Sequence, residues 1–313
     1  MQNQQDRVAW IGLGLLGYEL TQHLQKYIAS QSLPGLAVWN RTTEKATALQ
    51  SIVPGIQVAT SIDELFSKYK ANIVFTSLQN DAIVEQVYEQ LVSIASNVQY
   101  PIVFVETGTL YPRLSEKLEK QISSLPQNHV YLQCPVFGRP EAARLAQMVW
   151  VASGDQVAVE RLKPYFNSMS RKVLDLKTTD VKAGSTLKLL GNFMIMSYTE
   201  LVSESLNIAK KANLDPQHLI SFVDEFIPAP AFQQYTRRIV GGAEEPDAVE
   251  MTVNIALKDV GALRQWGQEI GAPTPTADLV RENYVTAKEK GLTKNWNYLI
   301  DTINSTADNS SEN

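Results

Sequence analysis

The sequence contains a single cysteine and only three histidines among its 313 residues, and this scarcity excludes several kinds of site. Because Cys134 stands alone, an intrachain disulfide and a cysteine-rich metal site are excluded, and we expect a small buried side chain. His23, His129 and His218 lie far apart, and none belongs to a His-Glu-x-x-His pattern. We therefore expect no metal centre and no Ser-His-Asp site.

Basic residues and long apolar runs are also scarce. The net charge is −5, with 28 Lys and Arg against 33 Asp and Glu, so the chain lacks the basic field that neutralises a phosphate backbone. No run approaches the ~18 apolar residues of a membrane span, and residues 1–7 are too polar for a signal peptide. We expect no nucleic-acid partner, no membrane contact and a cytoplasmic location.

What the first half does contain is an alternation of short apolar runs with helical patterns. Hydrophobic residues make up 44% of the chain, enough to build cores in two domains. Runs at Val8–Gly12 and Leu36–Trp39 enclose the helical pattern Leu16–Ala29, which is the rhythm of a βαβ unit. Further strands are predicted at Ile73–Thr76, Ile102–Glu106, Val130–Gln133, Val149–Ala152 and Val173–Leu176, and helices at Asp81–Leu91, Pro112–Leu125 and Asp155–Ser168.

After about residue 178 the pattern is helical, apart from proline and glycine breaks. Its first segment, Val181–Asn213, is apolar on more than one face, so we expect it to be buried between domains or against a second subunit. The predicted fold is an α/β Rossmann N-terminal domain followed by an all-α C-terminal domain with a long interdomain helix. We place these domains at residues 1–177 and 178–304, with a disordered tail at 305–313.

A glycine-rich turn, Gly12-Leu13-Gly14-Leu15-Leu16-Gly17, follows the first predicted strand and opens the first helix. This is the context in which G-x-G-x-x-G indicates a dinucleotide site. Gly12 permits the tight turn, Gly14 lets a pyrophosphate approach the backbone, and Gly17 lets helix and strand pack closely. The free N–H groups of the helix start face the phosphates.

The residues after the second predicted strand favour NADPH over NADH. An acidic residue usually pairs with the free ribose hydroxyl of NAD here, whereas this chain has Asn40-Arg41-Thr42, with Lys45 one turn into the next helix. Arg41 can grip a 2′-phosphate bidentately, and Asn40 and Thr42 supply neutral hydrogen bonds. The alternative, a surface arginine in a turn, leaves the missing acid unexplained.

Lys188 and Asn192 are the candidates for chemistry, because they lie four residues apart on one helix face. Reduction of a carbonyl leaves an alkoxide that a lysine can protonate, and an asparagine can orient the same oxygen. A Lys-x-x-x-Asn pair on a helix is more often a solvated face, so the surrounding motifs decide between the two interpretations.

Taken together, the chain resembles the β-hydroxyacid dehydrogenase family, which includes 3-hydroxyisobutyrate dehydrogenase, glyoxylate and succinic semialdehyde reductases and relatives of 6-phosphogluconate dehydrogenase. The resemblance covers nearly the whole chain. Its elements are the glycine-rich turn, Glu106–Pro112, Cys134–Gly138, Gly184–Asn192 and Leu257–Asp259.

The resemblance implies a role for each matching position. Lys188 is implied to be the catalytic acid/base and Asn192 a substrate ligand, with Lys258 near the nicotinamide and Asp259 near the substrate. It implies that Ser77, Leu78 and Thr109 line the cofactor site, that Gly138 lies in the substrate loop, and that the long helix forms a homodimer.

Two departures concern the substrate. Gly108 stands where the family usually has serine, and Phe137-Gly138-Arg139 replaces its usual Ser-Gly-Gly anchor. Arg139 either holds an anion from a different direction or pairs with Glu141. Asn295-Trp296-Asn297 also departs from the family's usual aspartate and serine.

We therefore expect an NADPH-dependent oxidoreductase that transfers hydride between NADP(H) and a small aldehyde, keto acid or 3-hydroxy acid. One alternative is an imine reductase-like enzyme, which shares the Trp39–Thr42 type of motif, although Lys188 argues against it. A second alternative is a noncatalytic protein that binds NADPH.

Overall fold

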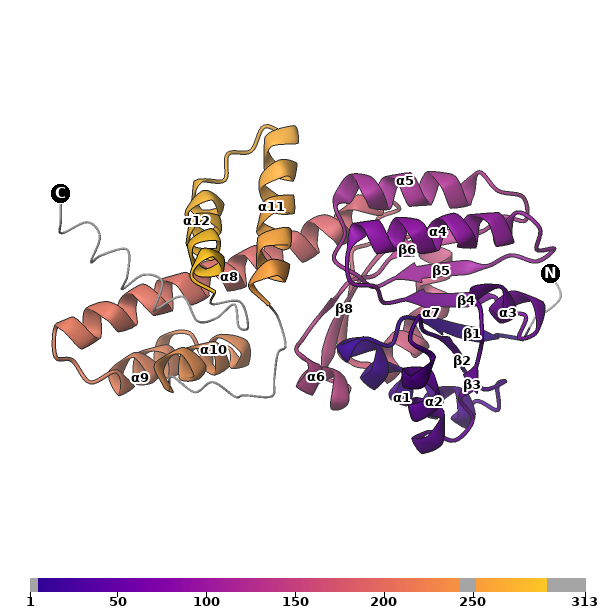
Figure 1. Cartoon of the computed structure of the whole chain (residues 1–313), viewed down its shortest axis with the longest axis horizontal. Helices are drawn as coiled ribbons and strands as arrows, with labels where there is room; N and C mark the ends of the chain where they lie inside the picture. The colour runs from indigo at the N-terminus through magenta and orange to yellow at the C-terminus, as the bar shows by residue number, and fades with distance from the viewer. Residues whose placement is uncertain (1–4, 242–251, 292–313) are drawn as a thin grey trace. The chain divides into compact units, whose positions relative to one another are not determined.

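The computed structural model describes residues 5–241 and 252–291. The chain divides into two compact units, residues 1–188 and 189–313. The first unit contains β1 (Val8–Ile11), α1 (Leu15–Ser30), β2 (Ala37–Trp39), α2 (Thr43–Ile52), β3 (Gln57–Val58), α3 (Ile62–Ser67), β4 (Ile73–Thr76), α4 (Asp81–Ala95), β5 (Val103–Glu106), α5 (Pro112–Ser123), β6 (Val130–Gln133), β7 (Val136–Phe137), α6 (Pro140–Arg144), β8 (Met148–Gly154), α7 (Gln156–Ser168) and β9 (Ser170–Asp175) (Figure 1).

The first unit is built on one sheet, whose strand order β3-β2-β1-β4-β5-β6 is that of a doubly wound dinucleotide-binding fold. These strands are parallel, with Ala9 opposite Ala37 and Val74 opposite Phe104. β8 then pairs with β6 in the antiparallel direction and also contacts β7 and β9. The predicted Rossmann domain is confirmed.

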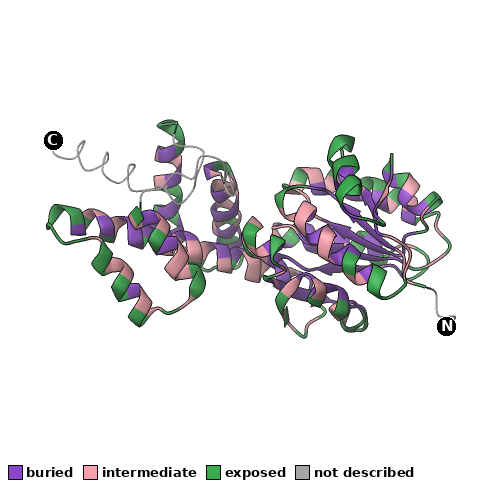
Figure 2. Ribbon diagram, turned by 90° about the horizontal axis from the view of Figure 1, so that it is seen from below, coloured by how far each residue is buried: buried purple, intermediate pink, exposed green. Residues whose placement is uncertain are grey.

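Helices cover both faces of the sheet, and each face has its own apolar core. Neighbouring residues of a strand point to opposite faces. Trp10 therefore packs with the core beneath α1 and α7, whereas Ile11 packs with the core beneath α4 and α5. Figure 2 shows the strands as a continuous buried layer between partly exposed helices. Strands buried on both faces explain the near-continuous apolar runs of the sequence.

Side-chain caps and prolines fix where several helices begin. The side chains of Asn80 and Asp155 accept hydrogen bonds from the N–H groups of Ile83 and Ala158, at 3.0 and 2.8 Å. Pro112 is the first residue of α5, where its missing N–H would have had no helical partner. Each start follows directly on a strand or a short loop, so the helices return the chain to the amino end of the sheet.

The helix α8 (Lys182–Lys211) runs for 30 residues, about 45 Å, and passes through the boundary between the units. The second unit continues with α9 (Gln217–Phe226), α10 (Pro230–Gly241), α11 (Val253–Glu269) and α12 (Pro275–Glu289). Its core joins Met196 of α8 to Val260 of α11 and Tyr284 of α12.

The predicted helical half is confirmed for the described residues, with α10 starting at Pro230 and ending at Gly241. No helix in residues 5–241 and 252–291 is long and apolar enough to cross a membrane. The division at residue 177 stays a prediction. The predicted tail at 305–313 and the segment Asn295–Asn297 lie outside the described residues.

Candidate functional site

The glycine-rich turn lies at the carboxyl end of β1 and has the geometry that its spacing predicts. Gly12 has φ +96°, and a Cβ there would overlap the backbone oxygen of Ser77, the residue directly after the neighbouring strand β4. A Cβ on Gly17 would overlap the backbone oxygen of Gly12, so α1 and β1 pack backbone against backbone. The indole N–H of Trp10 also donates to that oxygen, at 2.9 Å.

The start of α1 fits the pyrophosphate of a dinucleotide. Gly14 is its N-cap residue, in an extended conformation and without a side-chain cap, and a Cβ there would meet no atom within 4 Å. The first turn of α1 holds no acidic residue. The helix start therefore offers N–H groups and a partial positive charge to an anion that can come close to the backbone.

The residues after β2 comprise a half-buried asparagine that contacts the backbone and exposed basic side chains. The side-chain oxygen of Asn40 accepts from the N–H of Leu13 at 2.8 Å, and its amide donates to the carbonyl of Thr42 at 2.9 Å. Arg41, Thr42 and Lys45 are exposed. Asn40 is therefore engaged with the backbone, while the basic side chains remain open to a ligand at this edge of the sheet.

Two further loops follow the neighbouring strands at the same edge. Ser77 and Leu78 come directly after β4, and Thr109 follows β5 by three residues. The Ser77 N–H donates to the carbonyl of Ile11 at 2.9 Å, and the Leu78 side chain lies beside Gly12. Because the carboxyl ends of parallel strands meet at one edge, these predicted cofactor residues are brought next to the glycine-rich turn.

Glu106, the last residue of β5, is a fully buried acid that the sequence interpretation did not assign to the site. Its carboxyl accepts from the hydroxyl of Thr76 at 2.5 Å and from the N–H of Gly108 at 2.7 Å. Burial raises the pKa of Glu106 to about 7, although these two hydrogen bonds act in the opposite direction. The sequence feature that could have identified Glu106 is a charged residue at the end of an otherwise apolar strand.

Gly108 is held between two side chains. Its N–H donates to Glu106, and its carbonyl accepts from the amide of Gln133 at 3.1 Å. A Cβ on Gly108 would lie only 2.7 Å from the carboxyl oxygen of Glu106, which real Cβ contacts do not show. The glycine that replaces the family's usual serine therefore leaves room for the glutamate carboxyl, which a larger residue at 108 would displace from its hydrogen bonds.

Buried hydroxyl groups connect this loop to the start of α8. Gln133 also accepts from Ser115 at 3.1 Å, and the hydroxyls of Ser115 and Ser185 are 2.5 Å apart. The N–H of Gly184 donates to the Ser153 hydroxyl at 3.1 Å, and a Cβ on Gly184 would lie 2.5 Å from the same oxygen. The first turn of α8 is therefore fixed against the sheet, one turn before Lys188.

Lys188 is the last residue of the first unit, and its ammonium nitrogen lies 4.3 Å from the ring centroid of Phe137. Phe137 ends β7, which follows the carboxyl end of β6 after two residues. The structure therefore brings two sequence-predicted residues from distant parts of the chain into direct contact. Both side chains are half-buried.

The substrate loop predicted after Phe137 is compact. Gly138 has φ +144°, and a Cβ there would lie 2.5 Å from the sulfur of Met148. Arg139 is the N-cap residue of α6. Glu141 forms an ion pair with Arg144, at 4.0 Å. Phe137 therefore supplies the aromatic wall of this loop.

The second unit holds the other predicted residues. The amide of Asn192 donates to the buried carboxylate of Asp259 at 2.7 Å, and the other carboxylate oxygen lies 3.1 Å from the ammonium of Lys258. Asp259 is 2% exposed. A carboxylate in this position orients the Asn192 side chain and the Lys258 side chain together.

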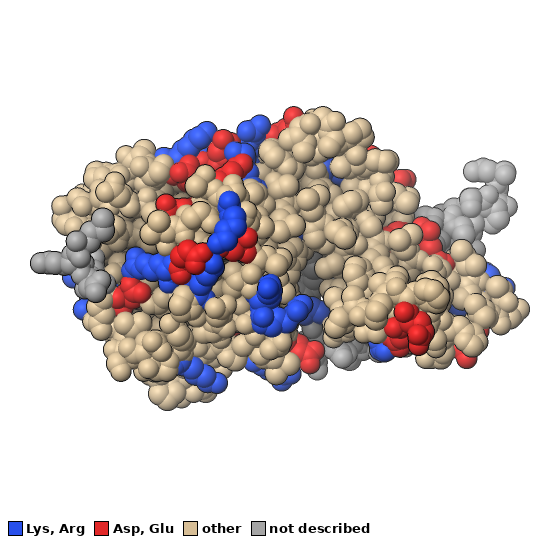
Figure 3. Space-filling view, turned by 180° about the vertical axis from the view of Figure 1, so that it is seen from behind, with Lys and Arg blue, Asp and Glu red and all other residues tan. Residues whose placement is uncertain are grey.

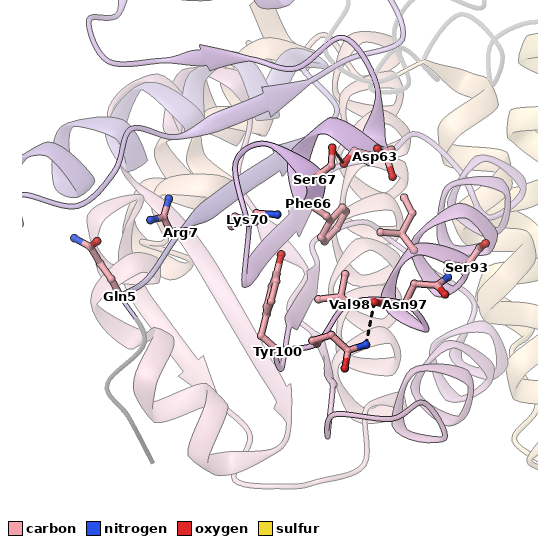
Figure 4. A pocket seen from close by; sticks show the side chains of 12 residues that line it. Gln5, Arg7, Asp63, Phe66, Ser67, Lys70, Ser93, Asn97, Val98 and Tyr100 are labelled. Atoms are coloured by element: carbon pink, nitrogen blue, oxygen red, sulfur yellow. Dashed lines mark hydrogen bonds between the residues drawn. The ribbon is translucent and has the colours of Figure 1, made fainter.

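A hollow of the first unit lies apart from these residues. It measures about 870 Å³ and is lined by Arg7, Phe66 and Tyr100, among others (Figure 4). Arg7 precedes β1, whereas Gly12 follows it, so the hollow lies at the amino ends of the parallel strands. None of the predicted site residues lines it.

Cys134 is buried, as expected, and burial raises the pKa of its thiol.

Charged side chains of both signs lie beside one another on the face drawn in Figure 3. On α7 and β9, for example, Lys163 contacts Glu160 at 2.5 Å and Asp175 at 3.1 Å. These charges neutralise one another locally.

Comparison with known proteins gave matches over both units. Residues 7–178 match the NAD binding domain of 6-phosphogluconate dehydrogenase, and residues 183–298 match the family described as NAD-binding of NADP-dependent 3-hydroxyisobutyrate dehydrogenase. An NADH-dependent oxidoreductase of Aspergillus ustus is 26% identical over 274 residues, which cover 88% of this chain and 90% of that protein.

Solved structures share the fold. A 3-hydroxyisobutyrate dehydrogenase from Salmonella typhimurium superposes with a TM-score of 0.78 at 20% identity, covering 95% of this chain and 99% of the other. An imine reductase from a Pseudomonas species superposes with a TM-score of 0.59 at 18% identity, covering 96% and 100%.

Proposed function

Because the chain belongs to the β-hydroxyacid dehydrogenase family, we propose that it transfers hydride between NADP(H) and a small carbonyl compound, with Lys188 as the acid/base. Members of this family are oxidoreductases that act on a hydroxyl group and use a nicotinamide dinucleotide, and both properties hold for this chain. The carbonyl compound of the proposal is an aldehyde, a keto acid or the matching 3-hydroxy acid.

The observation that carries the proposed reaction is the place of Lys188 in the first unit. Its ammonium lies against Phe137, beyond the carboxyl end of β6, and the glycine-rich turn follows the carboxyl end of β1 in the same sheet. A dinucleotide bound at this edge reaches toward the loops after the neighbouring strands. The lysine therefore lies at the same edge of the sheet as the proposed cofactor site, where the strands have their carboxyl ends.

The reduced nicotinamide, when bound, supplies the hydride that reduces the carbonyl carbon. Lys188 donates a proton from its ammonium to the carbonyl oxygen, and in the reverse direction the neutral amine takes that proton from the hydroxyl. Asn192, one turn further along α8, orients the same oxygen, and Asp259 fixes the Asn192 amide. The cofactor role of Lys258 and the substrate role of Asp259 stay predictions.

The preference for NADPH is supported by the residues after β2. Arg41 and Lys45 are exposed there, and no acidic side chain follows the strand before Glu44. A 2′-phosphate would be attracted by these cations, whereas the ribose hydroxyl of NADH would lack its usual carboxylate partner. The relative from Aspergillus ustus is described as NADH-dependent, so the preference requires direct measurement.

The experiment follows NADPH oxidation by absorbance with glyoxylate, succinic semialdehyde, methylglyoxal, tartronate semialdehyde and larger apolar aldehydes, with NADH in parallel. Lys188→Ala should lower kcat by about a hundredfold to ten-thousandfold while the KM for NADPH stays unchanged. Lys172→Ala, at an exposed position of β9, serves as the control. Full turnover by Lys188→Ala would remove the lysine from the mechanism.

An imine is the second candidate substrate, because Phe137 gives the loop an aromatic wall beside Lys188. One cyclic imine belongs in the same panel. Turnover of the imine without activity on any aldehyde would assign the chain to imine reduction.

We also propose a homodimer formed through α8. Leu190, Met194, Leu201 and Ile208 are 44–68% exposed, and their spacing places them on one face of the helix. An apolar stripe of this length is typical of a protein–protein interface. Sedimentation should show a dimer that dissociates in the double variant Met194→Glu, Leu201→Glu but persists in Val157→Glu on α7.

The cytoplasmic location stays a prediction.

A further inference from the structure

The contact between Lys188 and Phe137 joins two elements that are each rigidly held. Phe137 lies in β7, where it is opposite Val149 of the longer strand β8. The start of α8 is fixed by the hydrogen bonds of Gly184 to Ser153 of β8 and of Ser185 to Ser115 of α5. The backbone positions of Lys188 and Phe137 are therefore set by the fold, and the ammonium lies 4.3 Å from the ring centroid.

The ring can restrain the lysine through its charge distribution. The face of an aromatic ring is electronegative, so it attracts an ammonium group by about 0.5–2 kcal/mol, depending on burial. A lysine side chain has about 2 kcal/mol of rotamer entropy to lose when it is held in one place. A ring that already holds the ammonium in position has removed part of this freedom before the reaction, so less of it is lost in the transition state.

We propose that Phe137 is a positioning residue for Lys188. This inference rests on the proposed reaction, because Lys188 is its acid/base. The negative ring face attracts the ammonium and keeps it beyond the carboxyl end of β6.

The loop directly after the ring is closely packed. Gly138 presents no side chain, and the space that its Cβ would fill is occupied by the sulfur of Met148 and the Cβ of Ala142. Because Gly138 follows Phe137 directly, this packing limits how far the backbone of Phe137 can move.

The first test compares variants of Phe137 with wild type at saturating NADPH. Phe137→Leu keeps an apolar side chain but removes the ring face, so kcat should fall by about twofold to thirtyfold, with the KM for NADPH unchanged. Phe137→Tyr restores an aromatic face and should restore kcat. Phe226→Leu, an exposed position of α9, is the matched control. Equal kcat in Phe137→Leu and wild type would overturn the positioning role.

The second test separates an effect on the lysine from an effect on the substrate, with succinic semialdehyde and its methyl ester as a matched pair. A positioning role predicts that Phe137→Leu lowers kcat by the same factor for both substrates. A loss confined to one of them would show that the ring acts on the substrate and would overturn the positioning role.

A third measurement does not depend on turnover. Reductive methylation with a carbon-13 label converts each lysine into a dimethylammonium group that remains cationic, and the signal absent from Lys188→Ala belongs to this residue. The ring should displace that signal upfield in wild type but not in Phe137→Leu. An unshifted signal would overturn the inference, whereas a shifted signal without turnover of any carbonyl would support the positioning and defeat the proposed reaction.

Discussion

The side-chain oxygen of Asn40 accepts a hydrogen bond from the backbone N–H of Leu13, at a distance of 2.8 Å. The bond ties the end of β2 to the middle of the glycine-rich turn, 27 residues earlier in the chain. Gly12 is tied to the same strand, because its N–H donates to the carbonyl of Trp39 at 3.0 Å. The shape of the turn therefore depends on the residue that precedes Arg41.

Asn40→Ala should weaken both cofactors alike. The variant leaves the Leu13 N–H without its acceptor, which costs about 1–3 kcal/mol when the group is buried, and the distorted turn is common to NADPH and NADH. We expect both KM values to rise by a similar factor, of about fivefold or more. Asn40→Asp keeps an acceptor but adds a negative charge, so it should spare NADH and impair NADPH. Unequal effects of Asn40→Ala on the two cofactors would refute the shared role.

Arg41→Ala should affect only one cofactor. Loss of a charged hydrogen bond worth about 1.5–3 kcal/mol predicts a tenfold to hundredfold rise in the KM for NADPH, with the KM for NADH unchanged. Arg171→Ala, an exposed position of β9, controls for the loss of one positive charge. If the cofactor preference of Arg41→Ala matches wild type, the specificity argument is wrong.

Gly17→Ala should mainly lower the stability of the fold, whereas Gly14→Ala should mainly weaken cofactor binding. The added methyl at residue 17 overlaps the backbone oxygen of Gly12, so we expect a loss of about 1–3 kcal/mol in the free energy of unfolding. At residue 14 the methyl meets no atom within 4 Å, so stability should change by less than about 1 kcal/mol while NADPH binding weakens. Urea unfolding and cofactor titration measure the two effects, and equal stability losses would contradict this assignment.

Glu106 should make the folded state less stable as the pH rises. Burial raises its pKa from 4.5 to about 7, so between these values the folded state retains a proton that the unfolded state releases. Unfolding free energy therefore falls across this window, by about 3 kcal/mol for a shift of this size, at ~1.4 kcal/mol per pKa unit.

Urea unfolding of wild type and Glu106→Gln at several pH values measures this contribution. The glutamine cannot ionise, so the variant should lose the part of the pH dependence that Glu106 causes. Glu200, whose pKa burial also raises to about 7, remains in both proteins and cancels in the difference. Parallel curves for the two proteins would show that Glu106 does not titrate in this range.

The strands and the glycine-rich turn could be predicted because their signals are local. Buried parallel strands give uninterrupted apolar runs, as in Ile73–Thr76, and the three glycines each answer a steric requirement within a few residues. The long helix was also predictable, since it contains no proline. The structure has it at Lys182–Lys211, close to the expected Val181–Asn213.

Other features depend on contacts between distant residues. The two-residue strand β3 at Gln57–Val58 is half-buried and too short to show a period in the sequence. The cation–ring contact of Lys188 joins residues 51 positions apart, and the sequence placed Phe137 in the substrate loop without indicating a contact with Lys188. The oxygen and the amide of Asn40 both contact the backbone, which sequence spacing cannot reveal, and the predicted hydrogen bond of Asn40 to the cofactor stays a prediction.

The close approach of Glu106 to Gly108 makes these two positions dependent on each other during divergence. A serine at residue 108 needs the space that the glutamate carboxyl occupies, so serine becomes acceptable only after residue 106 has become shorter. A shorter acid, in turn, leaves the Gly108 N–H without its acceptor. Exchange of this pair one residue at a time therefore passes through a less stable intermediate, whichever residue changes first.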